Sequence, residues 1–297
     1  RDMPYRLAAT ATPAPNDQME LGNHAEFLGV MQSREMLSRW FVNDTSQASQ
    51  KWRLKGHAAA SFWDWTASWA RAISRPSDIG HDDAGFALPD LREINHVVEA
   101  DRSINAGDDD GQMRLFRMPE MSATSLHKEK RLTLAARADA IAAAVLAEPS
   151  EPWVIWVDTN DEADAICDRV AGAVEVRGSM TSDQKEDRLV AFSEGRERVL
   201  VTKPSIAGFG LNWQHCARTA FVGRTFSFEA YYQAIRRFWR FGQTRPVDVH
   251  SAMSDTERSI FAAVKRKERS NHEMKAEMRA AMRRACLTRS EEHTSEL

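Results

Sequence analysis

Length, composition and charge together exclude several classes of protein. The 297 residues are 42% hydrophobic and 28% charged, as in globular domains, and no apolar run approaches the roughly 20 residues that a membrane-spanning helix needs. A formal net charge of -3 excludes a protein that binds nucleic acid through an overall positive charge, so any basic surface must be local.

The cysteines and the two ends of the chain indicate its setting. Cys167, Cys216 and Cys286 lie far apart without the spacing of zinc ligands, which argues against a zinc site or a disulfide framework and favours a reducing, intracellular setting. The chain opens without an initiator methionine, so we expect the interior of a longer protein. Residues 289–297, RSEEHTSEL, resemble the translation of a sequencing adapter, and we expect a non-native tail there.

The first third of the chain contains three recognisable stretches. Residues 6–16, RLAATATPAPN, predict a strand-like run that ends in a Thr-Pro turn. In FWDWTASWARAI, Trp65, Trp69 and Ile73 recur at four-residue spacing, which predicts an amphipathic helix with an aromatic face. Packing in a core is the interpretation that we favour for this face, and stacking on nucleic-acid bases is the alternative. The Pro-, Gly- and Asp-rich residues 74–91 predict a long loop.

Two further stretches lie between residues 105 and 146. The three aspartates of NAGDDDGQ, residues 105–112, could suggest a metal site, but an acidic run bounded by glycines is typical of a solvated turn. The alanine-rich residues 131–146, RLTLAARADAIAAAVL, predict a helix.

From residue 151 onward, short apolar runs alternate with amphipathic stretches. Buried strands are predicted at 153–157, 174–177, 198–202, 219–223 and 246–250. Helices are predicted at 161–171, 182–192 and 228–241, and from about residue 255. This alternation predicts βαβ units and a parallel sheet flanked by helices, an α/β fold whose binding site lies at the carboxyl ends of the strands.

Three arginines follow a glutamine closely in YYQAIRRFWRFGQTRP, residues 231–246. Helical spacing predicts that Gln233, Arg237 and Arg240 share one face, that Arg236 points elsewhere, and that Gly242 ends the helix. The many aromatic residues favour a helix at the rim of a packed surface. Because a guanidinium donates several hydrogen bonds in a plane and keeps its charge, these side chains suit a phosphate.

The last predicted helix is basic. Between residues 265 and 289 the sequence has nine Lys or Arg side chains against three Glu. A solvated helix face and a local patch for nucleic acid are both open interpretations of this run.

Several separated stretches together resemble the second half of a superfamily two helicase, and within that superfamily the Swi/Snf-like DNA translocases. ATATPAPN is similar to motif III, with Ala11 in place of the usual glycine, and WVIWVDT is similar to motif IV. The stretch RGSMTSDQKEDRLVAF is similar to the segment that follows motif IV. TKPSIAGFGLNW is similar to motif V, and QAIRRFWRFGQTRPV to motif VI. The resemblance covers roughly residues 1–30 and 130–255.

The resemblance implies roles for individual residues. Arg237 and Arg240 are expected to be arginine fingers for the γ-phosphate of ATP, with Gln233 ordering the site. Gly208, Gly210 and Asn212 of motif V are expected to couple nucleotide state to the DNA backbone. Nucleic-acid contacts are expected from Thr202 and Ser205, and from Thr10 and Thr12 of motif III.

Residues 161–164 spell Asp-Glu-Ala-Asp, the name of a helicase magnesium box, but they follow motif III instead of preceding it. Acidic residues in a first helical turn, with Thr159 or Asn160 as the cap, account for them. The sequence has no phosphate-binding loop of the Gly-x-x-x-x-Gly-Lys type and no acidic box before residue 6. We therefore expect ATP and Mg²⁺ to be held mainly by a missing first lobe, the present residues to offer no metal site, and the chain alone to be inactive.

The resemblance implies a RecA-like sheet and a division of the chain. We expect residues 1–35 to end the first lobe, 36–125 to form a mainly helical insert of the kind found in phage and prophage helicases, and 126–260 to form the second lobe. A basic helix, 261–288, and the tail would follow. The expected function is an ATP-driven helicase or translocase on double-stranded DNA in the cytoplasm of a bacterial cell or phage-infected host, with no membrane partner. A restriction-type or RNA-directed helicase subunit and a non-catalytic nucleic-acid-binding lobe are the alternatives.

Overall fold

The computed structural model describes residues 3, 5–44, 51–99, 130–208, 210–223, 227–254 and 258–295. These residues form two compact units, one made of Arg1–Phe86 with Lys265–Leu297 and the other of Ala87–Val264. Within the described ranges no helix combines the length and apolar character needed to span a bilayer. The acidic run at 105–112 lies outside the described residues.

The second unit is built on a six-stranded sheet in the order β3-β8-β7-β4-β6-β5, and every neighbouring pair is parallel. The predicted parallel α/β fold is therefore confirmed. The strands are β3 (Leu91–Val98), β4 (Trp153–Trp156), β5 (Ala173–Val176), β6 (Val199–Thr202), β7 (Arg218–Phe221) and β8 (Val247–Ser254).

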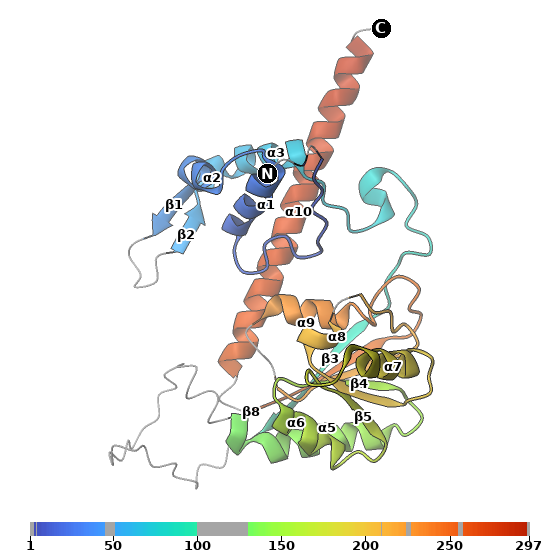
Figure 1. Ribbon diagram of the computed structural model, residues 1–297. Helices are drawn as coiled ribbons and strands as arrows, with labels where there is room; N and C mark the ends of the chain where they lie inside the picture. The colour runs from blue at the N-terminus through green and yellow to red at the C-terminus, as the bar shows by residue number, and fades with distance from the viewer. Residues whose placement is uncertain are drawn as a thin grey trace, which may run out of the picture. The chain divides into compact units, whose positions relative to one another are not determined.

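Helices cover both faces of this sheet, as Figure 1 shows for α5 and α6 below it and α8 and α9 above it. One face packs a core of Ile141, Val145 and Ile166 against Val201 and Val222. The other face packs α7, α8 and α9 around Trp156, Trp213 and Phe238. The helices are α5 (Leu134–Ala147), α6 (Asn160–Cys167), α7 (Ser182–Ser193), α8 (Pro204–Ala207) and α9 (Phe228–Ile235).

The cap residues of this unit follow the sequence closely. The Thr159 hydroxyl accepts a hydrogen bond from the Glu162 amide, and the Glu162 carboxylate accepts one from the Thr159 amide, so the predicted cap of the Asp-Glu-Ala-Asp helix is confirmed. Thr181 and Gln184 form the same reciprocal pair at the start of α7. Each capping box ends the preceding loop and so fixes the residue at which its helix begins.

Strand β3 is an element of the second unit that the sequence did not predict. It lies within residues expected to form a mainly helical insert, yet Leu91–Val98 pair with all of β8 along the sheet edge. Half-buried and exposed positions partly alternate along it, because an edge strand is open to solvent on one side. The sequence LREINHVV lacks the continuous apolar run of the central strands, and so gives a weaker signal.

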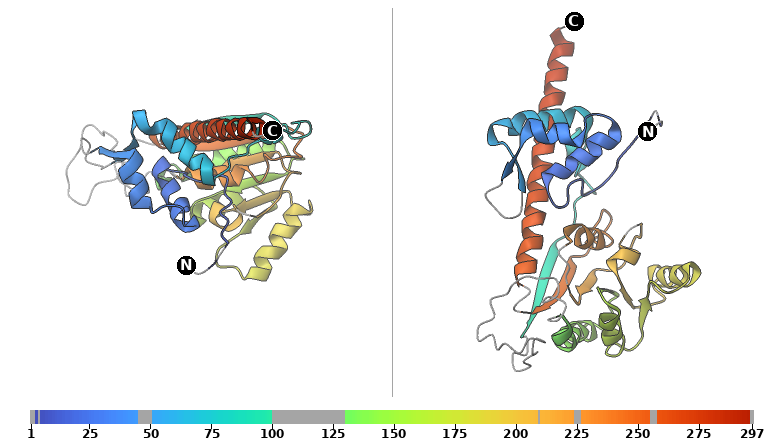
Figure 2. Two further views of the ribbon diagram at one scale, coloured as in Figure 1. Left: turned by 90° about the horizontal axis from the view of Figure 1, so that it is seen from above. Right: turned by 60° about the vertical axis from the view of Figure 1, so that its left-hand side comes forward.

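The first unit gathers short helices around part of α10 (Arg258–Ser295), as seen in Figure 2. Its other helices are α1 (Leu21–Leu28), α2 (Ser33–Trp40) and α3 (Ala59–Trp69), with 3-10 turns η1 (Gln18–Glu20), η2 (Gly56–Ala58) and η3 (Pro76–Ile79). β1 (Phe41–Asp44) and β2 (Lys51–Leu54) form an antiparallel hairpin, which the sequence did not predict either. The core contains Met36, Phe62 and Trp63 with Met274 and Met278 of α10.

The aromatic helix of this unit serves packing, as favoured from the sequence, but through a different face. Phe62, Trp63, Thr66 and Ala67 are its buried residues, and the helix ends at Trp69. Trp65 stacks on Trp40 with ring centroids 4.7 Å apart. The predicted continuation to residue 73 is wrong, because Ile73 lies beyond the helix and is 56% exposed.

Two other sequence expectations for this unit are resolved. The described residues from 5 to 17 contain no strand, so the strand-like prediction for 6–16 is wrong, since a strand requires a hydrogen-bonded neighbour and none of the described strands pairs with it. The basic run of α10 is partly neutralised within the unit. Arg283 and Arg279 approach Asp78, and Arg284 bonds Asp64 at 2.7 Å.

A buried ion pair joins three elements at the carboxyl edge of the second unit's sheet. Arg137 of α5 is fully buried and donates to Glu162 of α6 at 2.8 Å, and its other donors reach the carbonyls of Val222 and Lys130 and the Thr133 hydroxyl. Burial alone would raise the pKa of Glu162, but the Arg137 guanidinium and hydrogen bonds to the carboxylate hold that pKa below its usual value. The arrangement leaves each charge compensated.

We expect Arg137→Ala to destabilise the second unit by about 3–5 kcal/mol, because it leaves the Glu162 carboxylate buried without its cation. Urea unfolding followed by tryptophan fluorescence measures the change. The matched control is Arg169→Ala, which breaks a more exposed pair with Asp139 and should cost about 1 kcal/mol or less. Equal losses in the two variants would contradict the assignment.

A histidine pair connects the edge strand to the sheet. His96 Nε2 of β3 lies 2.9 Å from His250 Nδ1 of β8, and the His250 ring meets Trp153 edge to face. Burial, with a smaller contribution from His96, lowers the pKa of His250 to about 4. Burial also lowers the pKa of His96, so both imidazoles are neutral in the folded state at pH 7. One ring nitrogen then donates its N–H to the other, which accepts.

Acidification should destabilise the protein through this pair. Because the folded His250 pKa is depressed from 6.5 to about 4, the unfolded state takes up a proton first as the pH falls through that window. We expect the free energy of unfolding to be roughly 2 kcal/mol lower at about pH 5 than at about pH 7 on this account alone. His250→Phe should flatten the dependence, whereas the exposed His81→Phe should not; urea titrations at several pH values test both, and identical slopes would refute the role of His250.

Candidate functional site

The carboxyl end of β6 opens the first part of the candidate site. Thr202, the last residue of that strand, is fully buried, and its hydroxyl donates to the Val176 carbonyl at 3.2 Å. This side chain belongs to the sheet and offers no surface to a nucleic acid, which corrects the sequence-based expectation. Ser205 lies in the single turn of α8 and is exposed.

A glycine loop follows α8, and its described residues are 208 and 210–212. A Cβ on Gly208 would lie 2.3 Å from the Pro204 carbonyl oxygen, to which the Gly208 amide already donates, so only glycine fits there. Gly210 has a φ of 76°, in the left-handed region that favours glycine, and it is exposed like Asn212. The loop therefore presents main chain and a small polar side chain to solvent.

The three arginines lie around an irregular turn, residues 236–241, which we call the arginine turn. Helix α9 ends at Ile235, so the prediction of a helix through Phe241 is wrong. The Phe238 amide bonds the Ile235 carbonyl and the Arg240 amide bonds the Phe238 carbonyl, which breaks the helical pattern. Phe238 is fully buried between rings of the core, and this packing redirects the chain. The shared helical face of Gln233, Arg237 and Arg240 is lost with it.

Arg237 nevertheless joins the arginine turn to the glycine loop. Its Nε donates to the Gln233 carbonyl at 3.1 Å and its Nη1 to the Leu211 carbonyl at 3.0 Å. In return the Arg237 carbonyl accepts from the Trp213 amide at 3.0 Å. Burial, followed by the charges of Arg240 and Arg236, lowers the pKa of Arg237, although a guanidinium stays charged at neutral pH.

The other two arginines differ sharply. The Arg236 guanidinium lies 5.3 Å from the centre of the Trp239 ring and 5.7 Å from that of Tyr232, and it donates to the Trp239 carbonyl. Arg240 is partly exposed, and across the described ranges its side chain has no hydrogen bond or ion pair, although its main chain is bonded on both sides. Arg240 thus keeps its donors available for an anion, whereas Arg236 serves the turn itself.

All six of these predicted residues lie within the second unit, and Arg237 bonds the carbonyls of Gln233 and of Leu211 in the glycine loop. The six are Gly208, Gly210, Asn212, Gln233, Arg237 and Arg240. Thr10 and Thr12 belong to the first unit, where Thr10 is exposed and Thr12 is 4% exposed with its amide bonded to the Thr10 hydroxyl. Within the described part of the chain no cluster of three His, Cys, Asp or Glu could hold a metal ion.

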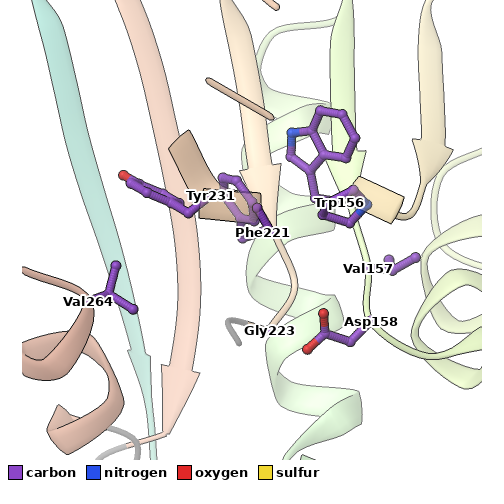
Figure 3. Close-up of a pocket in the computed structure, with 9 residues that line it drawn as sticks. Trp156, Val157, Asp158, Phe221, Gly223, Tyr231 and Val264 are labelled. Carbon is purple, nitrogen blue, oxygen red and sulfur yellow. The ribbon is translucent and has the colours of Figure 1, made fainter. Parts of the chain in front are cut away.

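A small cavity at the ends of β4 and β7 was not predicted from the sequence. Figure 3 shows Asp158 and Gly223 just beyond those strands, with Trp156, Phe221 and Tyr231 around them. Its volume of about 10 Å³ accommodates about one water molecule. Burial raises the pKa of Asp158 even though Lys130 lies 2.6 Å away. Its position directly after the apolar run WVIWV was the available signal.

Comparisons with known proteins agree with this architecture. Residues 136–242 match the family model described as the helicase conserved C-terminal domain. A search of curated proteins found no match.

Three solved structures are similar in fold. The C-terminal part of the Fun30 ATPase domain is 17% identical with a TM-score of 0.39, and the match covers 43% of this chain and 44% of the other. S. cerevisiae Dbp5 bound to RNA and ADP BeF3 is 16% identical with a TM-score of 0.41, covering 49% and 43%. The RNA-helicase Prp28 from Chaetomium thermophilum bound to ADP is 13% identical with a TM-score of 0.43, covering 60% and 36%.

In each case this chain spans less than half of the matched chain. The residues that match the family model, 136–242, contain β4, β5, β6, β7 and α9, and they end at Gly242, directly after the arginine turn. The second unit thus has the parallel, helix-flanked sheet of a RecA-like fold, and residues 136–242 within it match the model of the helicase conserved C-terminal domain.

Proposed function

We propose that this chain is the C-terminal part of an ATP-driven translocase on double-stranded DNA of the Swi/Snf-like type. Its second unit would supply arginine side chains to a nucleotide held by another RecA-like lobe. The glycine loop would contact the DNA backbone. The single observation that most supports this proposal is that Arg237 and Arg240, in the arginine turn beside that loop, have no carboxylate partner within the described residues.

Seven other arginines in the described part of the second unit have carboxylate partners, whereas Arg188 and Arg198 donate to main-chain carbonyls. Such pairs are formed by Arg92, Arg137, Arg169, Arg177, Arg196, Arg218 and Arg245. Arg237 and Arg240 have none within the described ranges, although Arg237 is partly buried and repelled by its neighbours. Two adjacent cations without a counter-ion favour an anionic ligand of high charge, such as a polyphosphate.

The chemistry of phosphoryl transfer gives these side chains a role. Charge spreads over the oxygens of the transferred group in the transition state, and a guanidinium placed there stabilises that charge. Arg240 has all its donors available, and Arg237 has Nη2 beyond its two carbonyl bonds. Since the described residues contain no cluster for a metal, we assign no residue of this chain to Mg²⁺, which would arrive with the nucleotide.

Nucleic-acid contact is assigned to the exposed part of the glycine loop and α8. Main-chain amides near Gly210, the Asn212 side chain and the Ser205 hydroxyl can donate to phosphate oxygens without reading the bases. Thr10 remains a candidate in the first unit. Thr202 is withdrawn from this set because its hydroxyl is buried in the sheet.

In a protein that joins this chain to a RecA-like lobe encoded upstream, Arg240→Ala should lower kcat for DNA-stimulated ATP hydrolysis by roughly 10³-fold or more, because the transition-state charge loses its cation. Steady-state ATPase assays with duplex DNA measure this. The exposed Arg196, paired with Glu194, provides a matched Arg→Ala control that should retain activity.

Unchanged turnover in Arg240→Ala would contradict the arginine-finger assignment. The upstream coding sequence offers a second test, because a phosphate loop and an acidic magnesium box must be encoded there. If neither is encoded there, the proposal of an enzyme is wrong and a non-catalytic nucleic-acid-binding lobe is the better interpretation.

The chain should bind duplex DNA more tightly than single-stranded RNA of equal length and base sequence, and affinity should fall with salt because the contacts are to phosphates. Fluorescence anisotropy measures both. Ser205→Glu should weaken binding roughly tenfold by placing a negative charge beside the backbone. Ser182→Glu, at the exposed start of α7, is the control for added charge. Preference for RNA would favour the RNA-directed alternative.

A further inference from the structure

The arginine turn is bonded to a part of the chain far from it in sequence. The Trp239 indole Nε1 donates to the carbonyl of Pro89 at 2.6 Å, across 150 positions. Residues 87–93, which we call the entry segment, lead the chain from Phe86 into β3. No helicase-like motif recognised in the sequence contains this segment.

Further contacts hold the entry segment against α9 and β8. The Tyr231 hydroxyl donates to Glu93 at 2.7 Å, and Tyr231 is only 6% exposed. The Asp90 carbonyl accepts from the Val247 amide where β8 begins, and Leu91 packs against the core that contains Trp156 and Phe238. The segment is thus fixed on the same face as the arginine turn.

Within the arginine turn, Trp239 is the residue whose side chain bonds the entry segment. Arg236 lies over its ring and donates to its carbonyl at 3.1 Å, so the cation and the ring stabilise the same main-chain conformation. On the far side of Arg240, the Phe241 carbonyl accepts from the Gln214 amide nitrogen. Gly242 follows with a φ of 92°. Arg240 is therefore held between two anchored neighbours while its own side chain stays unbonded.

We propose that Trp239 is a positioning residue for Arg240, and that its bond to Pro89 lets the entry segment of β3 set where that guanidinium projects. The inference rests on the proposed function, because it assigns Arg240 to the phosphates of ATP. It adds that the strand preceding the helicase-like domain takes part in arranging the site.

The test uses this chain joined to the RecA-like lobe encoded upstream, as in the ATPase assay, and carries Trp239→Phe, which keeps an aromatic ring beneath Arg236 and removes the donor to Pro89. The backbone ¹⁵N order parameters of Arg240 and Phe241 should fall from near 0.85 toward roughly 0.6. Binding of Mg²⁺-ATP, titrated by the shifts of the arginine Nε–H resonances, should weaken about fivefold. Arg240→Ala should weaken binding at least as much.

Trp40→Phe is the matched control, since it removes the indole donor to Ser61 in the first unit. It should leave the Arg240 order parameter and ATP binding unchanged. If Trp239→Phe fails to fold by thermal melting, Tyr231→Phe serves in its place, because it deletes only the hydroxyl bonded to Glu93 and should act in the same direction.

The outcomes separate the two proposals. An unchanged Arg240 order parameter in the folded Trp239→Phe variant overturns the positioning role, whether or not the affinity for Mg²⁺-ATP changes. Weaker ATP binding in Arg240→Ala but not in Trp239→Phe also overturns it and leaves the proposed function standing. ATP binding that is indifferent to Arg240→Ala overturns the proposed function itself.

Discussion

The second unit depends on a single fully buried guanidinium. Arg137 reaches α6 through Glu162, the residue after β7 through the Val222 carbonyl and the residues before α5 through Lys130 and Thr133. Gly223 has to lack a side chain, because a Cβ would lie 2.6 Å from Arg137 Nη1 and 2.8 Å from Glu162 Oε1. One charge network therefore dictates a residue type in the next loop and fixes the carboxyl edge of the sheet, on which any site of this fold is built.

The regular part of the fold could be predicted because its central strands are continuous apolar runs. Trp153–Trp156 and Val199–Thr202 are buried at every position, as expected for strands covered on both faces. Strand β3 escaped prediction because its pairing with β8 is a long-range property that its mixed sequence does not encode locally. The end of α9 was misplaced for a similar reason, since core packing of Phe238 overrides helical spacing.

The candidate site was predictable in its location but not in the division of labour among its residues. The glycine loop and the arginines could be identified from their motifs. Which guanidinium bonds carbonyls, which lies on rings and which stays unbonded depends on partners such as Leu211 and Trp239 that only the folded chain brings together. The same holds for Thr202, whose hydroxyl turns into the sheet.

The sheet of the second unit is completed from outside the boundaries of the matched domain. Both β3 and β8 lie beyond residues 136–242, on either side of them. A recombinant protein trimmed to those limits would leave β7 as a bare edge with its backbone groups unpaired, and such edges invite strand-to-strand aggregation. Expression work on the second unit should accordingly begin upstream of Ala87, so that the whole sheet is included.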